Sequence, residues 1–196
     1  MNDRAANMND TAGHLEPFGV DIDLLTGAMK DPDSYKCTVA STMIPYYADR
    51  DAVERLVESQ NDPVHYEVFE KDVPEAEGHI RICISKLLPG KVGQEFFMTK
   101  GHYHTVLETA ETYLCIAGEG FLLMKTTDGR CLWEPFRPGR LVYCPSSWAH
   151  RSINTGPAPL VSLCHYPANA GHNYGDIVKE GFPKRCFDRS GTPVFQ

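Results

Sequence analysis

Apolar and polar side chains alternate in many short runs along this chain, and turn-forming residues separate the runs. Alternation with a period of two is typical of half-buried β-strands. The intervening segments PEAEG, PGKVG, AGEG, TDGR, RPG and NTGPAP are rich in glycine, proline or polar residues. The predicted strands cover residues 37–44, 64–69, 80–88, 95–98, 111–117, 120–126, 132–135, 141–144, 150–154 and 160–166.

One segment shows helical periodicity instead. In the run YYADRDAVERLVESQ, Val53, Leu56 and Val57 fall at helical spacing, and Asp49 or Asp51 is available to cap the N-terminus. No second helical pattern supplies the crossover helices of an α/β fold. The pattern therefore predicts an all-β fold, a sandwich or barrel with a few short helices.

The length and the start of the chain indicate its organisation. A chain of 196 residues suits one well-buried domain. Residues 1–16 contain mainly polar and small side chains and show no periodicity. We expect a flexible N-terminal tail over residues 1–16, followed by a single domain over residues 17–196.

Charge and cysteine content limit the partners and the compartment. The net charge of −7 provides no basic field for a nucleic acid or an anionic membrane surface, so neither partner is expected. The seven cysteines form no C-x-x-C pair, which is typical of reduced thiols. The chain also lacks a run of about 18 apolar residues and an apolar signal segment at its start. These features predict a cytoplasmic protein.

The segment TKGHYHTVLETAETYLCIAGEGFLLMK contains the candidate chemistry. His102 and His104 are two residues apart, so on an extended chain they can point the same way, and Glu111 follows. Imidazole and carboxylate groups together suit a borderline divalent metal ion. His150, in the run GRLVYCPSSWAHRSIN, is the best candidate for a fourth ligand. Four histidines outside the two segments are interpreted as structural or solvated: His14, His65, His79 and His165.

Two spacing patterns surround the four candidate ligands. The first is H-x-H, then a glutamate, then a glycine after six residues, and it comprises His102, His104, Glu111 and Gly118. The second, G-x5-P-x-G-x2-H-x3-N, comprises Gly139, Pro145, His150 and Asn154, with Ser147 in place of the inner glycine. In this order the patterns resemble the two motifs of the cupin family. The resemblance implies a double-stranded β-helix, or jelly-roll barrel, with a metal ion inside.

The gap after His104 leaves two candidates for the carboxylate ligand. Glu108 follows His104 after a gap of three residues, which is an ordinary cupin spacing, whereas Glu111 follows after six. Only Glu111 leaves the six-residue step to Gly118, and we favour it for that reason. The longer gap, together with KGHYH, AETYLCIAGEG, CPSSWAHRSINTG and HNYGDIVKEGF, resembles the cupin-type glucose-6-phosphate isomerases of archaea and some bacteria.

This second resemblance implies a metal-dependent aldose–ketose isomerase that interconverts glucose 6-phosphate and fructose 6-phosphate. It implies one divalent metal ion per chain, Fe²⁺ before Mn²⁺, Ni²⁺ or Zn²⁺, and by analogy with other cupins a homodimer. Glu111 would be either the base of a cis-enediol route or only a metal ligand during a hydride shift. His172 is implicated in ring opening or proton shuttling. The implied phosphate-binding residues are Ser85, Thr99, Gly101 through its backbone N–H, Tyr113 and Tyr166.

Two other functions fit the same residues. A non-catalytic cupin that binds sugar phosphates would keep the metal and lack turnover. A metal-dependent oxygenase would need iron and a more apolar pocket than one lined by the hydroxyl groups named above. The polar lining favours the isomerase.

Overall fold

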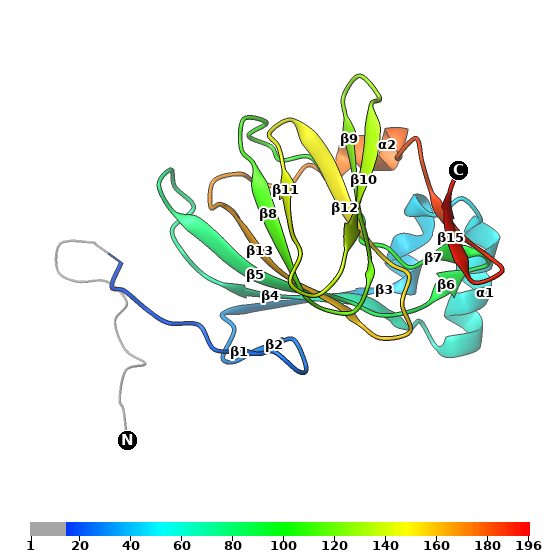
Figure 1. Cartoon of the computed structure of the whole chain (residues 1–196), viewed down its shortest axis with the longest axis horizontal. Helices are drawn as coiled ribbons and strands as arrows, with labels where there is room; N and C mark the ends of the chain where they lie inside the picture. Colours follow the sequence, from blue (N-terminus) through cyan, green and yellow to red (C-terminus); the bar gives the residue numbers. More distant parts are fainter. Residues whose placement is uncertain (1–14) are drawn as a thin grey trace.

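The computed structural model describes residues 15–196, so the predicted tail lies outside the described residues except for its last two positions. Two antiparallel sheets face each other and form a barrel (Figure 1). The larger sheet contains, in spatial order, β11 (Leu141–Cys144), β8 (Glu111–Ala117), β13 (Leu160–Pro167), β5 (Ile80–Leu87), β4 (Val64–Lys71) and β3 (Ser34–Val39). The smaller sheet contains β10 (Cys131–Phe136), β9 (Gly120–Thr126) and β12 (Trp148–Asn154).

Shorter elements flank the barrel. A further sheet of short strands lies beside helix α1, at the right in Figure 1. It contains β15 (Thr192–Phe195), β14 (Cys186–Arg189), β7 (Glu95–Phe96) and β6 (Lys91–Val92). A small hairpin is formed by β1 (Ile22–Asp23) and β2 (Ala28–Met29). The prediction of an all-β fold of the cupin type, with a few short helices, is confirmed.

Apolar side chains fill part of the barrel interior. Leu122 of β9 and Ile153 of β12, on the smaller sheet, are almost completely buried, as is Leu87 of β5 on the larger sheet. Along β5, the alternate residues Cys83 and Ser85 instead line a pocket. The inward face of the larger sheet therefore changes from apolar core to polar pocket within one strand.

Helix α1 (Arg50–Gln60) confirms the predicted helix. The Asp49 carboxylate accepts a hydrogen bond from the Ala52 N–H at 2.9 Å and so caps the N-terminus. Ala52 and Val53 are buried on the inner side of the helix. At the other end, Asn61 adopts a left-handed conformation with φ of 54° and terminates the helix.

Some local predictions are wrong. The strand predicted over residues 37–44 ends at Val39, and the 3₁₀ helix η1 (Ala40–Tyr46) follows it. The backbone N–H and the hydroxyl of Ser41 both donate to the Asp62 carboxylate at 2.7 Å, which favours the turn. The pattern also misses the helix α2 (Gly175–Glu180) and several of the short strands.

Among the described residues, no helix is long and apolar enough to cross a membrane. All seven cysteines are free thiols.

Candidate metal centre

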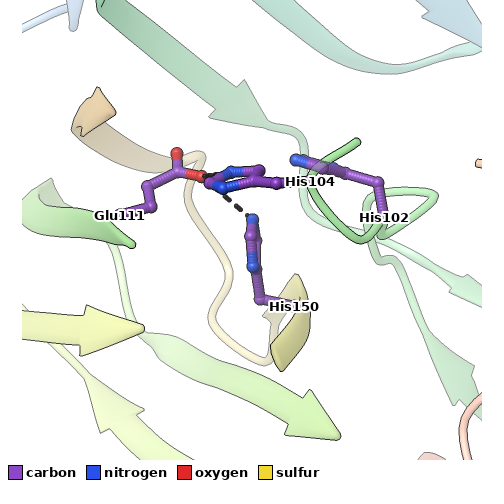
Figure 2. Close-up of side chains that lie close together, drawn as sticks. All are labelled: His102, His104, Glu111 and His150. Carbon is purple, nitrogen blue, oxygen red and sulfur yellow. Dashed lines mark hydrogen bonds and ion pairs between the residues drawn. The ribbon is translucent and has the colours of Figure 1, made fainter. Parts of the chain in front are cut away.

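Four predicted side chains meet inside the barrel. His102 and His104 belong to the segment between β7 and β8, Glu111 is the first residue of β8, and His150 lies in β12. One potential ligand atom from each side chain lies within 4.8 Å of those of the other three. Figure 2 shows the four side chains turned toward one another. The structure thus brings together the residues that the two spacing patterns single out.

Backbone pairing explains why two distant histidines become neighbours. The His102 N–H donates to the His150 carbonyl at 3.2 Å, and the His150 N–H donates to the His102 carbonyl at 3.1 Å. The two rings consequently lie close together, with their centroids 4.5 Å apart. His104 follows two residues after His102, and its ring lies 5.7 Å from the His102 ring. The expected common direction of this pair is therefore present.

One carboxylate oxygen of Glu111 lies close to two of the histidines. His104 Nε2 lies 3.1 Å from Glu111 Oε2, and His150 Nε2 lies 3.0 Å from the same oxygen but without hydrogen-bond alignment. Burial alone would raise the pKa of Glu111, but the nearby His150 and His104 imidazoles outweigh it and lower the pKa to about 2. The carboxylate is therefore ionised at neutral pH.

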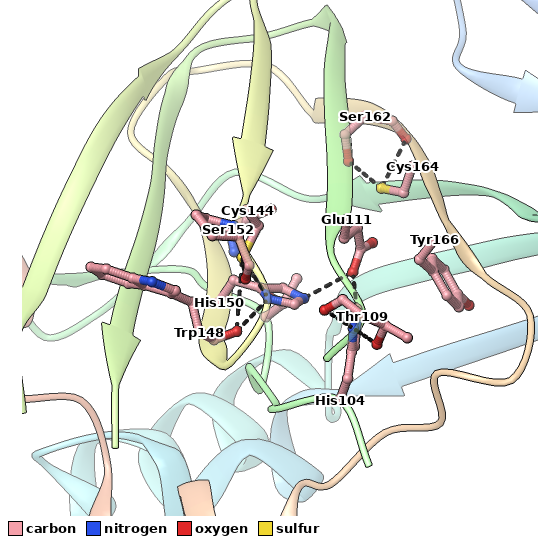
Figure 3. Close-up of polar contacts among 12 residues, drawn as sticks. His104, Thr109, Glu111, Cys144, Trp148, His150, Ser152, Ser162, Cys164 and Tyr166 are labelled. Carbon is pink, nitrogen blue, oxygen red and sulfur yellow. Dashed lines mark hydrogen bonds and ion pairs between the residues drawn. The ribbon is translucent and has the colours of Figure 1, made fainter. Parts of the chain in front are cut away.

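Partners on the far side of each ring control which nitrogen faces the cluster. The Thr109 hydroxyl donates to the Val106 carbonyl at 2.6 Å, so it accepts from His104 Nδ1, which is 2.8 Å away (Figure 3). His150 Nδ1 lies 3.2 Å from the Trp148 carbonyl oxygen. A proton on Nδ1 leaves the Nε2 lone pair of a neutral ring facing Glu111.

This arrangement fits a divalent cation. Two acceptors cannot bond each other, so the short contact between His104 and Glu111 requires either a second proton on the ring or a cation between the groups. Nε2 of His102 and Nε2 of His150 are buried and form no hydrogen bond to any described residue. Three imidazoles and one carboxylate are a ligand set that first-row divalent metals accept.

The structure distinguishes the two carboxylate candidates. Glu111 is 3% exposed and belongs to the cluster. Glu108 is exposed and borders a separate surface hollow. Of the two residues, only Glu111 is therefore in position to share a metal ion with the histidines.

A pocket adjoins the cluster and contains the predicted substrate-binding residues. It holds about 630 Å³ of space, including its open mouth, which is in the range of small-molecule sites. The predicted residues that line it are Ser85, Thr99, Gly101, Tyr113, Tyr166 and His172, together with His102, Glu111 and His150. The His172 ring lies 4.4 Å from the His102 ring, and burial lowers its pKa.

Strand β12 holds the Thr99 hydroxyl ready to donate. The Thr99 N–H bonds the Ser152 carbonyl at 3.0 Å, and the Ser152 N–H donates to Thr99 Oγ1 at 3.1 Å. Because the hydroxyl oxygen already accepts a hydrogen bond from the backbone, its proton is free to donate to a ligand in the pocket.

The Gly101 backbone is set by a buried arginine that sequence analysis missed. Gly101 has φ of 74°, and a Cβ there would lie 2.8 Å from the Phe182 ring and 3.1 Å from Arg151. Arg151 donates to the Lys100 carbonyl at 2.6 Å. In a trans peptide the next N–H points the opposite way, so the Gly101 N–H turns away from the arginine. It forms no hydrogen bond to another described residue.

Electrostatics also distinguish Arg151. The residue is 3% exposed, and burial lowers its pKa to about 10, so it remains charged at neutral pH. Its other donor, Nη1, contacts the Met98 sulfur at 2.8 Å, and the guanidinium lies 4.2 Å from the centre of the Phe182 ring. A buried positive charge therefore stands behind the segment that carries Thr99 and Gly101.

Glu70 and Lys36 are two further pocket residues that the sequence patterns did not indicate. The signal for Glu70 was present, because in β4 the alternate residues Tyr66, Val68 and Glu70 share one face, and that face lines the pocket. A charged residue at the end of an inward-facing series is unusual. Its assignment to the pocket required the sheet order.

Known proteins resemble this chain over most of its length. A family model described as glucose-6-phosphate isomerase matches residues 38–190. A glucose-6-phosphate isomerase of Thermococcus gammatolerans is 46% identical over 179 residues, which cover 91% of this chain and 93% of that protein. One of Thermococcus litoralis is 43% identical, covering 92% and 94%. Among solved structures, an oxalate oxidase overlaps 58% of this chain and 56% of its own, with a TM-score of 0.47 and 16% identity.

Proposed function

The chain belongs to the glucose-6-phosphate isomerase family, and we propose that it interconverts glucose 6-phosphate and fructose 6-phosphate at a divalent metal ion held by the four clustered side chains. The main support for a bound metal is the convergence of buried, unpartnered imidazole nitrogens on one carboxylate. When bound, the metal would polarise the carbonyl and hydroxyl oxygens of the open-chain sugar as a Lewis acid. Iron is our first candidate, before manganese, nickel or zinc.

Glu111 has two possible roles in moving the hydrogen between the reacting carbons. As a base, its carboxylate takes the proton from one carbon and returns it to the neighbour through a cis-enediol. In a hydride shift, Glu111 only holds the metal. Reaction in deuterated water separates these routes, because a proton on a carboxylate exchanges with solvent and a transferred hydride does not.

We assign His172 to ring opening. Its ring lies beside His102 at the pocket mouth, where the residue stays partly exposed, and the loss of some of its hydration lowers its pKa, so the imidazole is neutral at neutral pH. A neutral imidazole can accept a proton at one nitrogen and donate one at the other, which is what opening a cyclic sugar requires.

The phosphate group needs hydrogen-bond donors, and we place it near Ser85, Thr99 and Gly101. The free hydroxyl proton of Thr99 and the unpartnered Gly101 N–H are suitable donors. The charge of Arg151 behind them and that of Lys100 in the pocket lining both favour a dianion. Tyr113 and Tyr166 line the same pocket and complete the predicted set.

A coupled assay on purified protein tests this function. The protein is stripped of metal with a chelator and reloaded in turn with iron, manganese, nickel or zinc, and glucose 6-phosphate is supplied. We expect stripping to abolish turnover and reloading to restore it. A fully metallated protein that is inert on glucose, mannose and fructose 6-phosphates, and yet binds them, would instead be a binding protein.

The proposal also covers the oligomeric state and the cellular compartment. We infer a homodimer, and the edge strand β11, with Leu141 58% and Tyr143 60% exposed, supports pairing through strands. Analytical ultracentrifugation of the metal-loaded protein would report this assembly. The seven free thiols agree with a reducing, cytoplasmic setting.

A further inference from the structure

A buried carboxylate stands in the wall of a pocket that would receive a dianion. Glu70 is 6% exposed, and Glu111 is the other acidic residue that lines this pocket. Glu111 is accounted for by the metal cluster. Glu70 is not, although a negative charge there repels a phosphate group. The position of Glu70 in the pocket is therefore not explained by metal binding or by phosphate binding.

Three donors surround the Glu70 carboxylate. Lys36 Nζ and the Ser34 hydroxyl, both from β3, donate to Oε2 at 2.8 and 3.0 Å. The Tyr166 hydroxyl lies 3.2 Å from Oε1. Burial alone would raise the pKa of Glu70, but the hydrogen bond and charge of Lys36 outweigh it and hold the pKa below its ordinary value. Glu70 is thus an ionised group that can only accept.

Counting protons fixes the direction of the bond to Tyr166. A tyrosine hydroxyl has one proton, and an ionised carboxylate has none to offer. Tyr166 must therefore donate to Glu70. Its oxygen then has only lone pairs for a ligand in the pocket, so it can accept from a sugar hydroxyl and cannot donate to a phosphate.

Strand register places this pair at one end of the pocket. On β5, Cys83 pairs with Glu70, whereas Ser85 pairs with Val68. Residues two apart on a strand are about 7 Å apart, so Ser85 lies a step away from Glu70 along the pocket. The pairing of β13 with β8 joins His165 to Thr112, which sets Tyr166 level with the start of β8, where Glu111 lies. The Glu70 end is therefore the metal end.

We propose that Glu70, held by Lys36, is a positioning residue that makes the Tyr166 hydroxyl an acceptor and so reserves the metal end of the pocket for sugar hydroxyls. The phosphate is left with the opposite end, near Ser85 and Thr99. The substrate then enters with its reacting carbons toward the metal. This inference rests on the proposed isomerase function for its substrate, and it replaces a phosphate role for Tyr166 with a hydroxyl-binding role.

The substitution Glu70→Gln tests the proposal in the metal-loaded enzyme. Lys36 and Ser34 both donate to the same side, so they retain the amide oxygen and turn the amide N–H toward Tyr166. The Tyr166 proton is then released into the pocket. We expect inorganic phosphate to inhibit about tenfold more tightly, and kcat/KM for glucose 6-phosphate to fall about tenfold.

Two further substitutions, one of them also combined with Glu70→Gln, keep the test specific. Tyr166→Phe alone should leave inhibition by inorganic phosphate unchanged, and added to Glu70→Gln it should restore the wild-type value. Glu67→Gln is the matched control: Glu67 lies on the same strand, accepts from the Tyr35 hydroxyl at 2.7 Å and is within 3.8 Å of Lys86, but it faces away from the pocket. It removes the same charge and should change nothing.

Three results would overturn the proposal. Weaker phosphate inhibition in Tyr166→Phe would make Tyr166 a phosphate donor. Unchanged phosphate inhibition in Glu70→Gln would reduce Glu70 to a structural link between strands, and an equal effect of Glu67→Gln would reduce it to a distant charge. Calorimetric titration with inorganic phosphate gives the same comparison in protein without turnover, so failure of the isomerase function is a separate result.

Discussion

Two regions of this protein bury histidine, and they do so in opposite ways. His65 on β4 is fully buried, and its Nε2 lies 3.0 Å from the Tyr47 hydroxyl, while its ring stacks on Phe97 with the centroids 3.8 Å apart. In the metal cluster, Nδ1 of His104 and of His150 has polar partners, and Nε2 faces Glu111. Burial alone therefore does not indicate a ligand. What distinguishes the cluster is that Nε2 atoms converge on a carboxylate.

Replacing one histidine in each region should produce the largest difference in metal content and activity. His102→Ala removes an unpartnered ligand atom, so we expect loss of bound metal and a fall in kcat on the order of a thousandfold. His65→Gln should keep full metal content and activity within about twofold. Metal analysis and the coupled assay on both variants check this contrast, and equal losses in the two would contradict it.

Lowering the pH should destabilise the protein through the buried His65. Burial lowers the pKa of His65 to about 4, from an ordinary value of 6.5, so the unfolded chain binds this proton first as the pH falls. Stability from this group is complete above pH 6.5 and is lost between 6.5 and about 4. Between about pH 7.5 and about pH 4, the unfolding free energy of the wild type should fall about 3 kcal/mol more than that of His65→Gln.

Denaturant unfolding with a chelator present measures that difference without metal release. Parallel pH dependences of the two proteins would show that His65 is protonated equally in the folded and unfolded states. The comparison between the two regions would then lose its electrostatic basis.

We expect the smallest effect, on metal affinity, from removing the hydrogen-bond partner of the candidate ligand His104. Thr109→Val removes the hydroxyl that accepts from His104 Nδ1, and we expect metal affinity to weaken about tenfold. Thr112→Val is the matched control, because Thr112 borders a different hollow on the outside of the barrel. Competition with a metal-binding dye measures both affinities. An unchanged affinity in Thr109→Val would mean that the ring needs no such support.

The sequence predicted that the four side chains of the metal cluster would converge, because the spacing rules that indicate it are local. H-x-H on an extended chain sets two rings on one side, and the step from Glu111 to Gly118 selects one glutamate over Glu108. The assignment of these residues as metal ligands stays a prediction until a metal is bound. The barrel also followed from local alternation, and ten short strand-like runs were enough to indicate it.

What the sequence could not predict depends on contacts between distant segments. The turn at Ser41 is favoured by Asp62, and the direction of the Gly101 N–H depends on Arg151. Glu70 meets Tyr166 across the intervening strand β5. Each of these requires strand order and register, which alternation does not specify.

Anomalous X-ray diffraction from crystals of the iron-loaded protein tests the central claim most directly. We expect one iron peak per chain, within bonding distance of His102, His104, Glu111 and His150, and no such peak in crystals of His102→Ala. An iron peak elsewhere, or none in crystals of protein that isomerises glucose 6-phosphate, would contradict the account.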